Sequence, residues 1–124
     1  MSEGQKRMLR IFLVRHGETA QNLQMRYVGI LDEPLTVSGR RQARRAAAAL
    51  SRLPIEAIIS SPLRRAADTA AQIQKACSAQ LRMDSRLTEG SFGRWEGLTR
   101  QEVLSIGRRD AALLGRWETD PACA

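Results

Sequence analysis

The sequence predicts an α/β fold, a three-layer αβα arrangement with a mostly parallel sheet. Two short apolar runs that suit buried strands, residues 9–14 and 57–59, are each followed by a polar loop and then by apolar residues at helical spacing. Alternation of strand and helix is typical of right-handed βαβ units. The 124 residues, of which 43% are hydrophobic and 27% charged, suit one domain over residues 1–124.

The first apolar run, Leu9 to Val14, predicts a buried strand that ends at the polar loop Arg15-His16-Gly17. Loops at the carboxyl ends of strands are where α/β folds place their sites. A helix is expected after Thr36, which can cap its first turn, and Pro54 ends it. The apolar residues of this helix are Ala43, Ala46, Ala47 and Leu50.

The second apolar run, Ala57 to Ile59, predicts another strand. Ser61 suits the N-cap of the following helix and Pro62 its first position. The expected apolar face consists of Leu63, Ala66, Ala67, Ala70, Ile73 and Cys77. This register places Arg64 at the positive end of the helix dipole, where phosphate binds well, and leaves Arg65 as a solvated residue.

The last third of the chain has weaker signals. Leu81 to Leu87 is a strand candidate that leads into a loop containing Glu89. Thr99 and Glu102 form a capping-box pattern for a third helix, which continues poorly past Gly107.

The charge is strongly basic, with 20 Lys and Arg against 13 Asp and Glu, a net +7. All the basic residues except Lys6 and Lys75 are arginines, whose forked guanidinium groups suit phosphate oxygens, although a GC-rich genome would also favour arginine. Aromatic residues make up only 4%, and no nucleic-acid-binding module is present. We therefore expect an anionic partner but no nucleic acid.

Cysteine and hydropathy patterns indicate a cytoplasmic protein. Cys77 and Cys123 are far apart and have no neighbours at metal-ligand spacing, so we expect neither a disulfide framework nor a metal site. Near the N-terminus, the uninterrupted apolar stretch is only four residues long, from Ile11 to Val14. This is too short for a signal peptide or a membrane span.

The candidate site surrounds His16, the single histidine of the sequence. Arg15 precedes it and Gly17 follows it, so a guanidinium and an unhindered backbone can approach the same phosphoryl group. Two arginines near His16 would lower the pKa of the imidazole and keep it neutral and nucleophilic. This combination predicts phosphate chemistry.

Four segments resemble sequence blocks of the histidine phosphatase (phosphoglycerate mutase-like) superfamily, in the same order. They are LVRHGETAQN (13–22), DEPLTVSGRRQA (32–43), SSPLRRAADTA (60–70) and LTEGSFGRWEGLT (87–99). The resemblance implies a phosphoglycerate mutase-like fold and a phosphohistidine mechanism that needs no metal and no cofactor.

The resemblance also implies roles for five residues. His16 is the residue that becomes phosphorylated, Glu89 is the proton donor, and the phosphoryl oxygens are held by Arg15, Asn22 and Arg64. A bound phosphate dianion would raise the pKa of Glu89 and keep it protonated. From the residues alone, Asn22 could instead hold the backbone of its loop.

The block FGRWEGLT resembles the phosphatase branch of the family, which includes alpha-ribazole phosphatases. Phe92 and Trp95, both within this block, are expected to be packing residues. The resemblance therefore implies hydrolysis of a small phosphorylated metabolite. Two alternatives remain: a phosphoglycerate mutase-type transferase, and an inactive, truncated phosphate-binding remnant.

Two departures from the family pattern affect the prediction. Val28 stands where family members usually carry a polar residue, which puts a side-chain substrate contact there in doubt. Family enzymes also place a second histidine opposite the first, on a later strand, and this chain has only His16. We therefore expect a fold that is incomplete at the C-terminus, weak or no activity of the chain alone, and self-association through an uncovered sheet edge.

Overall fold

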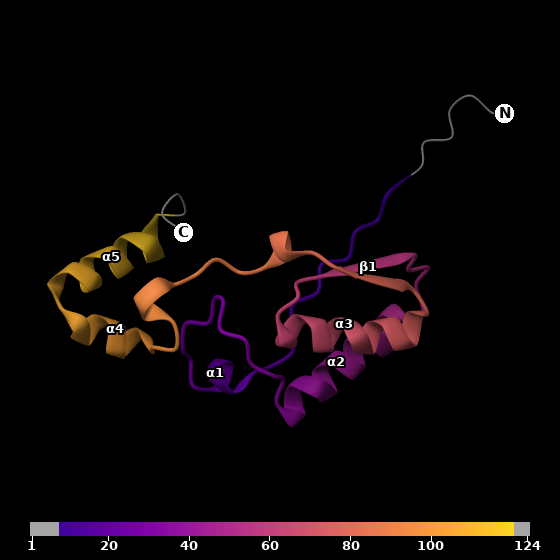
Figure 1. Ribbon diagram of the computed structural model, residues 1–124, viewed down its shortest axis with the longest axis horizontal. Helices are drawn as coiled ribbons and strands as arrows, with labels where there is room; N and C mark the ends of the chain where they lie inside the picture. Colours follow the sequence, from indigo (N-terminus) through magenta and orange to yellow (C-terminus); the bar gives the residue numbers. More distant parts are fainter. Residues whose placement is uncertain (1–7, 121–124) are drawn as a thin grey trace.

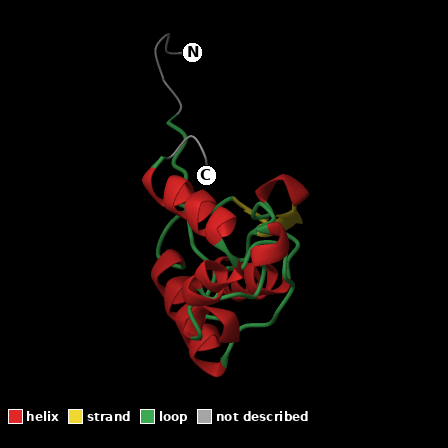
Figure 2. Ribbon diagram, turned by 90° about the vertical axis from the view of Figure 1, so that its left-hand side faces the viewer, coloured by secondary structure: helices red, strands yellow, loops and turns green. Residues whose placement is uncertain are grey.

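The computed structural model describes residues 8–120 and contains a small sheet with helices packed beside it (Figures 1 and 2). In chain order the elements are α1 (Ala20–Leu23), α2 (Val37–Leu50), β1 (Ala57–Ser60), α3 (Arg64–Cys77), β2 (Gln80–Met83), the 3₁₀ turns η1 (Ser85–Leu87) and η2 (Gly93–Trp95), α4 (Arg100–Ile106) and α5 (Arg108–Thr119). β1 and β2 pair in parallel, with Ala57 opposite Gln80 and Ser60 opposite Met83. The α/β class and the parallel pairing are confirmed.

Two groups of helices lie at opposite ends of the molecule (Figure 1). At one end α3 packs against both strands, and α2 packs against α3. Their shared core includes Ala43 and Ala47 from α2 and Ala70 and Ile73 from α3. At the other end α4 and α5 pack against each other. Val103 and Leu114 are completely buried there.

The two helices with the strongest capping patterns are confirmed. The Thr36 hydroxyl accepts a hydrogen bond from the Gly39 N–H, and α2 ends at Leu50. Thr99 and Glu102 form the predicted capping box of α4, because each side chain accepts a hydrogen bond from the other's backbone N–H. Caps depend on residues three apart in sequence, so the sequence alone can locate them.

The strand predicted over residues 9–14 is wrong. Within residues 8–120, no backbone hydrogen bond joins this segment to another, and Leu13 is 93% exposed. A strand forms only where a second backbone pairs with it, and β1 pairs with β2 alone. The segment instead lines a broad groove of about 1820 Å³ together with residues 54–61.

Three element boundaries also differ from the prediction. α3 begins at Arg64 rather than Pro62, because the Ser61 hydroxyl accepts a hydrogen bond from the Leu63 N–H in a turn before the helix. The predicted strand Leu81 to Leu87 ends at Met83, where the Asp84 carboxylate caps the following 3₁₀ turn. Past Gly107 a separate helix, α5, follows α4. Cys123 lies outside the described residues.

We find no helix in the described part of the chain with the length and apolar character needed to cross a bilayer.

The loop after His16 lies directly against the backbone of α2. A Cβ atom on Gly39 would collide with the carbonyl oxygen of Glu18, and one on Gly17 would collide with the carbonyl oxygen of Gly39. Neither backbone can move aside cheaply, since Gly39 lies within a helix. This contact therefore requires glycine on both sides.

We predict that Gly39→Ala destabilises the protein by about 1–3 kcal/mol through overpacking, although alanine is the better helix former. The matched control is Gly115→Ala in α5, because nothing lies within 4 Å of a Cβ atom there. That variant should be neutral or gain up to about 1 kcal/mol. Urea unfolding followed by circular dichroism measures both, and a Gly39→Ala variant as stable as Gly115→Ala would contradict the contact.

Candidate functional site

The loop that carries His16 is held between α2 and α3 by hydrogen bonds from its backbone N–H groups. The Gly17 N–H donates to the Thr69 hydroxyl of α3 at 3.0 Å, and the Glu18 N–H donates to the Gln42 side chain of α2 at 2.9 Å. The Glu18 carbonyl accepts from the Thr36 N–H at 2.9 Å. These contacts fix the loop immediately after the histidine, so the position of His16 is set by two helices.

The geometry of His16 suits a nucleophile. Its half-buried imidazole places Nδ1 2.7 Å from the Gly17 carbonyl oxygen, which can only accept a hydrogen bond. When Nδ1 carries the proton for this bond, Nε2 keeps its lone pair.

The charged groups around His16 favour the neutral imidazole. Burial, followed by the positive charges of Arg65 and Arg15, lowers the pKa of His16 below its usual value of 6.5. The hydrogen bond to the Gly17 carbonyl and the negative charge of Glu89 act in the opposite direction on this pKa but are outweighed. The predicted direction of this pKa shift is therefore correct, but burial is its largest cause and the second arginine that contributes is Arg65, not Arg64.

Arg65, which the sequence indicated as solvated, is one of the most buried polar residues, with 4% of its surface exposed. Its guanidinium donates to the Gly29 carbonyl at 2.6 Å and to the Leu31 carbonyl at 2.7 Å. The spacing of residues along the helix could have predicted that Arg65 is buried. Arg65, Thr69 and Ile73 recur every four residues and are all buried, so the inward face of α3 includes an arginine and a threonine.

Arg64 lies on the exposed side of α3. Its backbone N–H donates to the Asp32 carboxylate at 2.7 Å. Of Arg64 and Arg65, Arg65 is the one whose positive charge lowers the pKa of His16.

Of the other three predicted residues, Arg15 and Glu89 lie in loops, and Asn22 lies in α1. Arg15 and Glu89 are exposed, and both act electrostatically on His16. Asn22 accepts a hydrogen bond from the Thr19 N–H at 3.0 Å through its side-chain oxygen, as part of the capping box of α1. Asn22 thus holds the backbone of the loop.

Aromatic rings join the segment after Glu89 to α5. Tyr27 stacks at a tilt on Phe92, with 5.3 Å between ring centroids, and both rings meet Trp117 edge-on. Trp95 donates through its indole N–H to the buried Asp110 carboxylate at 2.8 Å. The packing role predicted for Phe92 and Trp95 is confirmed.

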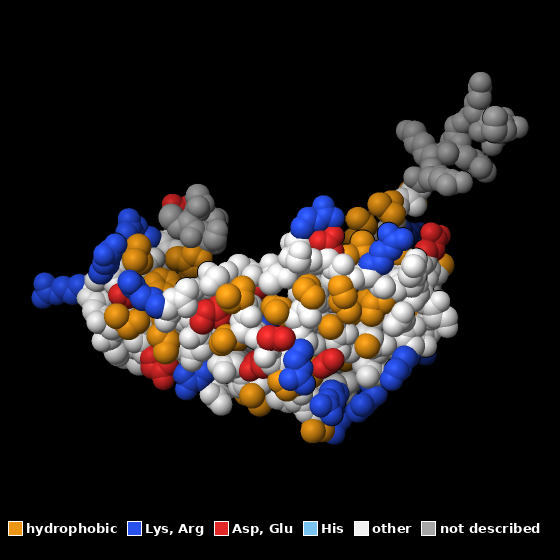
Figure 3. Space-filling model, in the orientation of Figure 1, with side chains coloured by type: hydrophobic (Ala, Val, Ile, Leu, Met, Phe, Trp, Pro, Cys, Tyr) orange, Lys and Arg blue, Asp and Glu red, His pale blue; other side chains and the backbone are white. Residues whose placement is uncertain are grey.

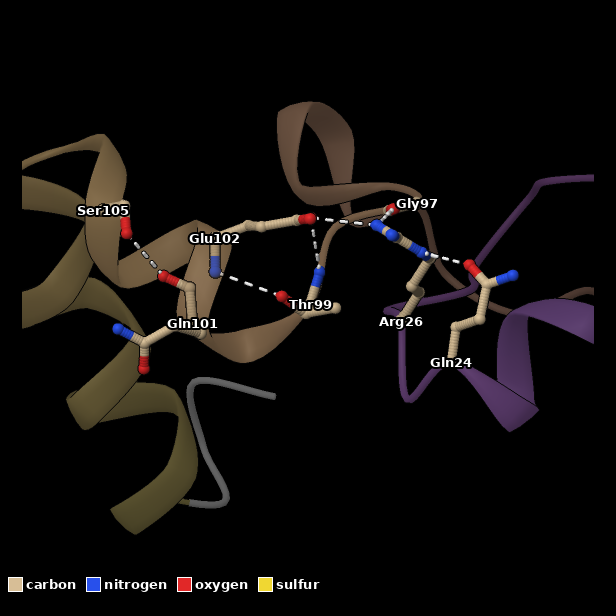
Figure 4. A network of polar contacts seen from close by, with 7 residues as sticks. All are labelled: Gln24, Arg26, Gly97, Thr99, Gln101, Glu102 and Ser105. Carbon is tan, nitrogen blue, oxygen red and sulfur yellow. Dashed lines mark hydrogen bonds and ion pairs between the residues drawn. The ribbon is translucent and has the colours of Figure 1, made fainter.

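A polar network connects the loop after α1 to the start of α4 (Figure 4). The Arg26 guanidinium donates to the Gly97 carbonyl at 2.8 Å and to the Glu102 carboxylate at 2.9 Å. The same carboxylate accepts from the Thr99 N–H at 3.0 Å. This network and the aromatic contacts place the helices α4 and α5 relative to the loop that contains Tyr27.

Positive charge is not confined to the site. Arg40, Arg41, Arg44 and Arg45 lie exposed on α2, and arginine side chains gather along the lower edge of the molecule beneath this helix (Figure 3). In residues 8–120, no group of three or more His, Cys, Asp or Glu residues is arranged to hold a metal ion.

Comparison with known proteins identifies the family. The profile of the histidine phosphatase superfamily (branch 1) matches residues 11–123. The chain belongs to this superfamily. It is 36% identical over 114 residues to phosphoserine phosphatase 1 of Hydrogenobacter thermophilus, covering 92% of this chain and 53% of that protein. It is also 45% identical over 86 residues to "Probable phosphoglycerate mutase GpmB" of Escherichia coli, covering 69% and 40%.

A solved structure assigned as an alpha-ribazole-5'-P phosphatase of Escherichia coli has the same fold, with a TM-score of 0.74 at 29% identity over 86% of this chain and 52% of that one. The chain thus spans between 40% and 53% of the length of these three relatives. The predicted family, its phosphoglycerate mutase-like fold and the likeness to its phosphatases are confirmed.

Glu96 organises the loop beside the site. Its carboxylate accepts hydrogen bonds from the backbone N–H groups of Gly29, Ile30 and Phe92 at 3.1, 2.9 and 3.0 Å. Burial by itself would raise the pKa of Glu96, but these donors outweigh it and hold the pKa below the usual 4.5.

We predict that Glu96→Gln lowers the free energy of unfolding at pH 7 by about 1–2 kcal/mol, because hydrogen bonds to a charged acceptor are replaced by neutral ones. A lowered pKa in the folded state stabilises the protein above the unfolded value, and this stabilisation is lost as pH falls through the folded value. The difference between the two proteins should therefore shrink below about pH 4.5. Urea unfolding from pH 7 to pH 3 checks this, and a constant difference would contradict it.

Proposed function

We propose that this chain carries the nucleophile of a metal-independent phosphomonoester hydrolase that acts on a small phosphorylated metabolite through a phosphohistidine. The observation that carries the proposal is the half-buried His16, whose Nδ1 lies 2.7 Å from a backbone carbonyl and whose Nε2 is left with its lone pair. Relatives named as phosphatases support the hydrolytic reaction.

In the first step Nε2 of His16 bonds to phosphorus, and the bond from phosphorus to the substrate oxygen breaks. Glu89 gives its proton to the departing alkoxide. In the second step a water oxygen bonds to phosphorus, the bond from phosphorus to nitrogen breaks, and the water proton passes to the Glu89 carboxylate. His16 and Glu89 are thereby returned to their starting protonation states.

Arginine and amide donors would stabilise the charge on the transferred phosphoryl oxygens. We assign this role to Arg15, Asn22 and Arg64, as the family resemblance implies, and add Arg65. Two of the five N–H donors of a guanidinium are used by Arg65 on the carbonyls of Gly29 and Leu31. Its guanidinium keeps its positive charge, which acts on His16.

Two alternatives differ from the hydrolase in what happens to the phosphoryl group. A mutase would pass the phosphoryl group to a second substrate hydroxyl and would depend on a bisphosphate primer, and the 45% identity to the mutase-named relative keeps this alternative open. Phosphate binding without formation of a phosphohistidine would identify a binding remnant instead.

The remaining expectations concern location and partners. We place the protein in the cytoplasm, with neither nucleic acid nor membrane as a partner and a small phosphorylated compound as substrate. Exposed apolar residues of the segment 9–14, together with Ile59 of β1 and Met83 of β2, support self-association through this edge of the sheet.

We predict that purified protein hydrolyses p-nitrophenyl phosphate without added metal and that His16→Ala removes the activity. The reason is that no other imidazole is present to accept the phosphoryl group. Release of p-nitrophenol measures turnover, and intact-protein mass spectrometry under mild conditions detects the added phosphoryl group. Equal rates in both proteins, with no added mass in either, would rule out the hydrolase.

We also predict that Arg65→Ala lowers the rate of His16 phosphorylation by roughly 100-fold or more, whereas Arg64→Ala lowers it by less than roughly ten-fold. Only Arg65 is both buried and close enough to His16 to affect its charge. The neighbouring arginine is the matched control, since both changes remove one guanidinium from the same turn of α3. A larger loss in Arg64→Ala than in Arg65→Ala would contradict this ranking and make Arg64 the more important phosphoryl contact.

A further inference from the structure

Thr69 is a buried residue of α3 whose hydroxyl joins the His16 loop to the helical turn of Arg65. The side chain lies in the packed interface, and the residue is 4% exposed. Its Oγ1 accepts a hydrogen bond from the Gly17 N–H at 3.0 Å and donates one to the Arg65 carbonyl at 2.8 Å. Only a side chain with a hydrogen-bond acceptor can occupy this position without leaving the buried Gly17 N–H unpaired.

The same set of bonds reaches the imidazole. The residue whose N–H is held by Thr69 is Gly17, and the Gly17 carbonyl oxygen lies 2.7 Å from Nδ1 of His16. Three successive hydrogen bonds therefore connect the backbone of Arg65 to the ring of His16. Because Gly17 has no side chain, its position depends on these bonds, on its contact with Gly39 and on the bond from the Glu18 N–H to Gln42, which holds the peptide that follows Gly17.

The other contacts of the loop act one residue later. Gln42 and Thr36 hold the backbone of Glu18 through its N–H and its carbonyl. Within residues 8–120, Thr69 supplies the hydrogen-bond acceptor for the Gly17 N–H. The Thr69 hydroxyl thus holds the His16–Gly17 peptide, while Gln42 holds the Gly17–Glu18 peptide that follows it.

We propose that Thr69 is a positioning residue that sets the orientation of His16 relative to Arg65. The proposal rests on the function assigned above only for its catalytic consequence. The geometric claim concerns the imidazole alone and can be tested without turnover.

The charged groups that act on His16 are Arg65 from α3, Arg15 from its own loop and Glu89 from the loop after η1. Without the Thr69 hydroxyl, the His16–Gly17 peptide loses its hydrogen bond to α3. We expect this peptide to shift, so that His16 becomes more solvated and more distant from Arg65. Both changes raise the pKa of the imidazole toward that of a free histidine.

The experiment is an NMR titration of the full chain, in which every imidazole signal belongs to His16 because the sequence has one histidine. The variants are Thr69→Val, which keeps the shape but removes the hydroxyl, and Thr69→Ser, which keeps the hydroxyl. Thr99→Val is the matched control, since it removes a hydroxyl that caps α4 and belongs to a different part of the structure.

We expect Thr69→Val to raise the pKa of His16 by roughly half a unit or more, with Thr69→Ser and Thr99→Val unchanged. The rate of His16 phosphorylation should fall roughly ten-fold or more in Thr69→Val alone. An unchanged pKa in Thr69→Val, or an equal rise in Thr99→Val, overturns the proposal.

If Thr69→Val does not fold, hydrogen exchange of the wild-type Gly17 amide decides the question. Protection as strong as that of the α3 amides supports the proposed bond, and exchange as fast as that of an exposed loop overturns it. Failure of the proposed function would give a different result. His16→Ala would then hydrolyse p-nitrophenyl phosphate at the wild-type rate, while the differences in the pKa of His16 among the Thr69 variants would remain.

Discussion

The backbone of the His16 loop lies so close to α2 that neither surface can carry a side chain at the point of contact. Gly17 and Gly39 meet there, and a Cβ atom on either would collide with a carbonyl oxygen of the other segment. On the opposite side Thr69 of α3 takes up the Gly17 N–H. A loop fixed by backbone contacts on two sides has little freedom, so the imidazole is held in place before any ligand binds. The packing of α2 on α3 is consequently part of the site and not only a support for it.

A second constraint joins the two ends of the molecule through the loop around Gly29. Arg65 of α3 donates to the carbonyls of Gly29 and Leu31, while Glu96 accepts from the N–H groups of Gly29 and Ile30. A cation and an anion from different segments thus satisfy the two kinds of backbone group in one loop. Through this loop the segment that contains Glu89 is placed relative to the helix that carries Arg65, and the charges of both act on His16.

Local signals explain which elements the sequence could predict. Thr36 and Thr99 cap helices through bonds to residues three positions away, and both helices form where the caps place them. The strand expected over residues 9–14 depends on a distant partner backbone, which no local pattern reveals. Arg65 was missed for a related reason. Its partners are backbone carbonyls of residues 29 and 31, and apolar periodicity does not distinguish a buried arginine with such partners from a solvated one.

The edge of the sheet and the His16 loop are held by different parts of the structure. The apolar segment 9–14 and the edge of β1 beside it remain exposed to the groove. The contacts that hold Gly17 and Glu18, in contrast, come from residues 36–69, all within the described chain. None of the contacts that fix the His16 loop involves the exposed segment or the edge of β1. The position of the imidazole therefore does not depend on how this edge is covered.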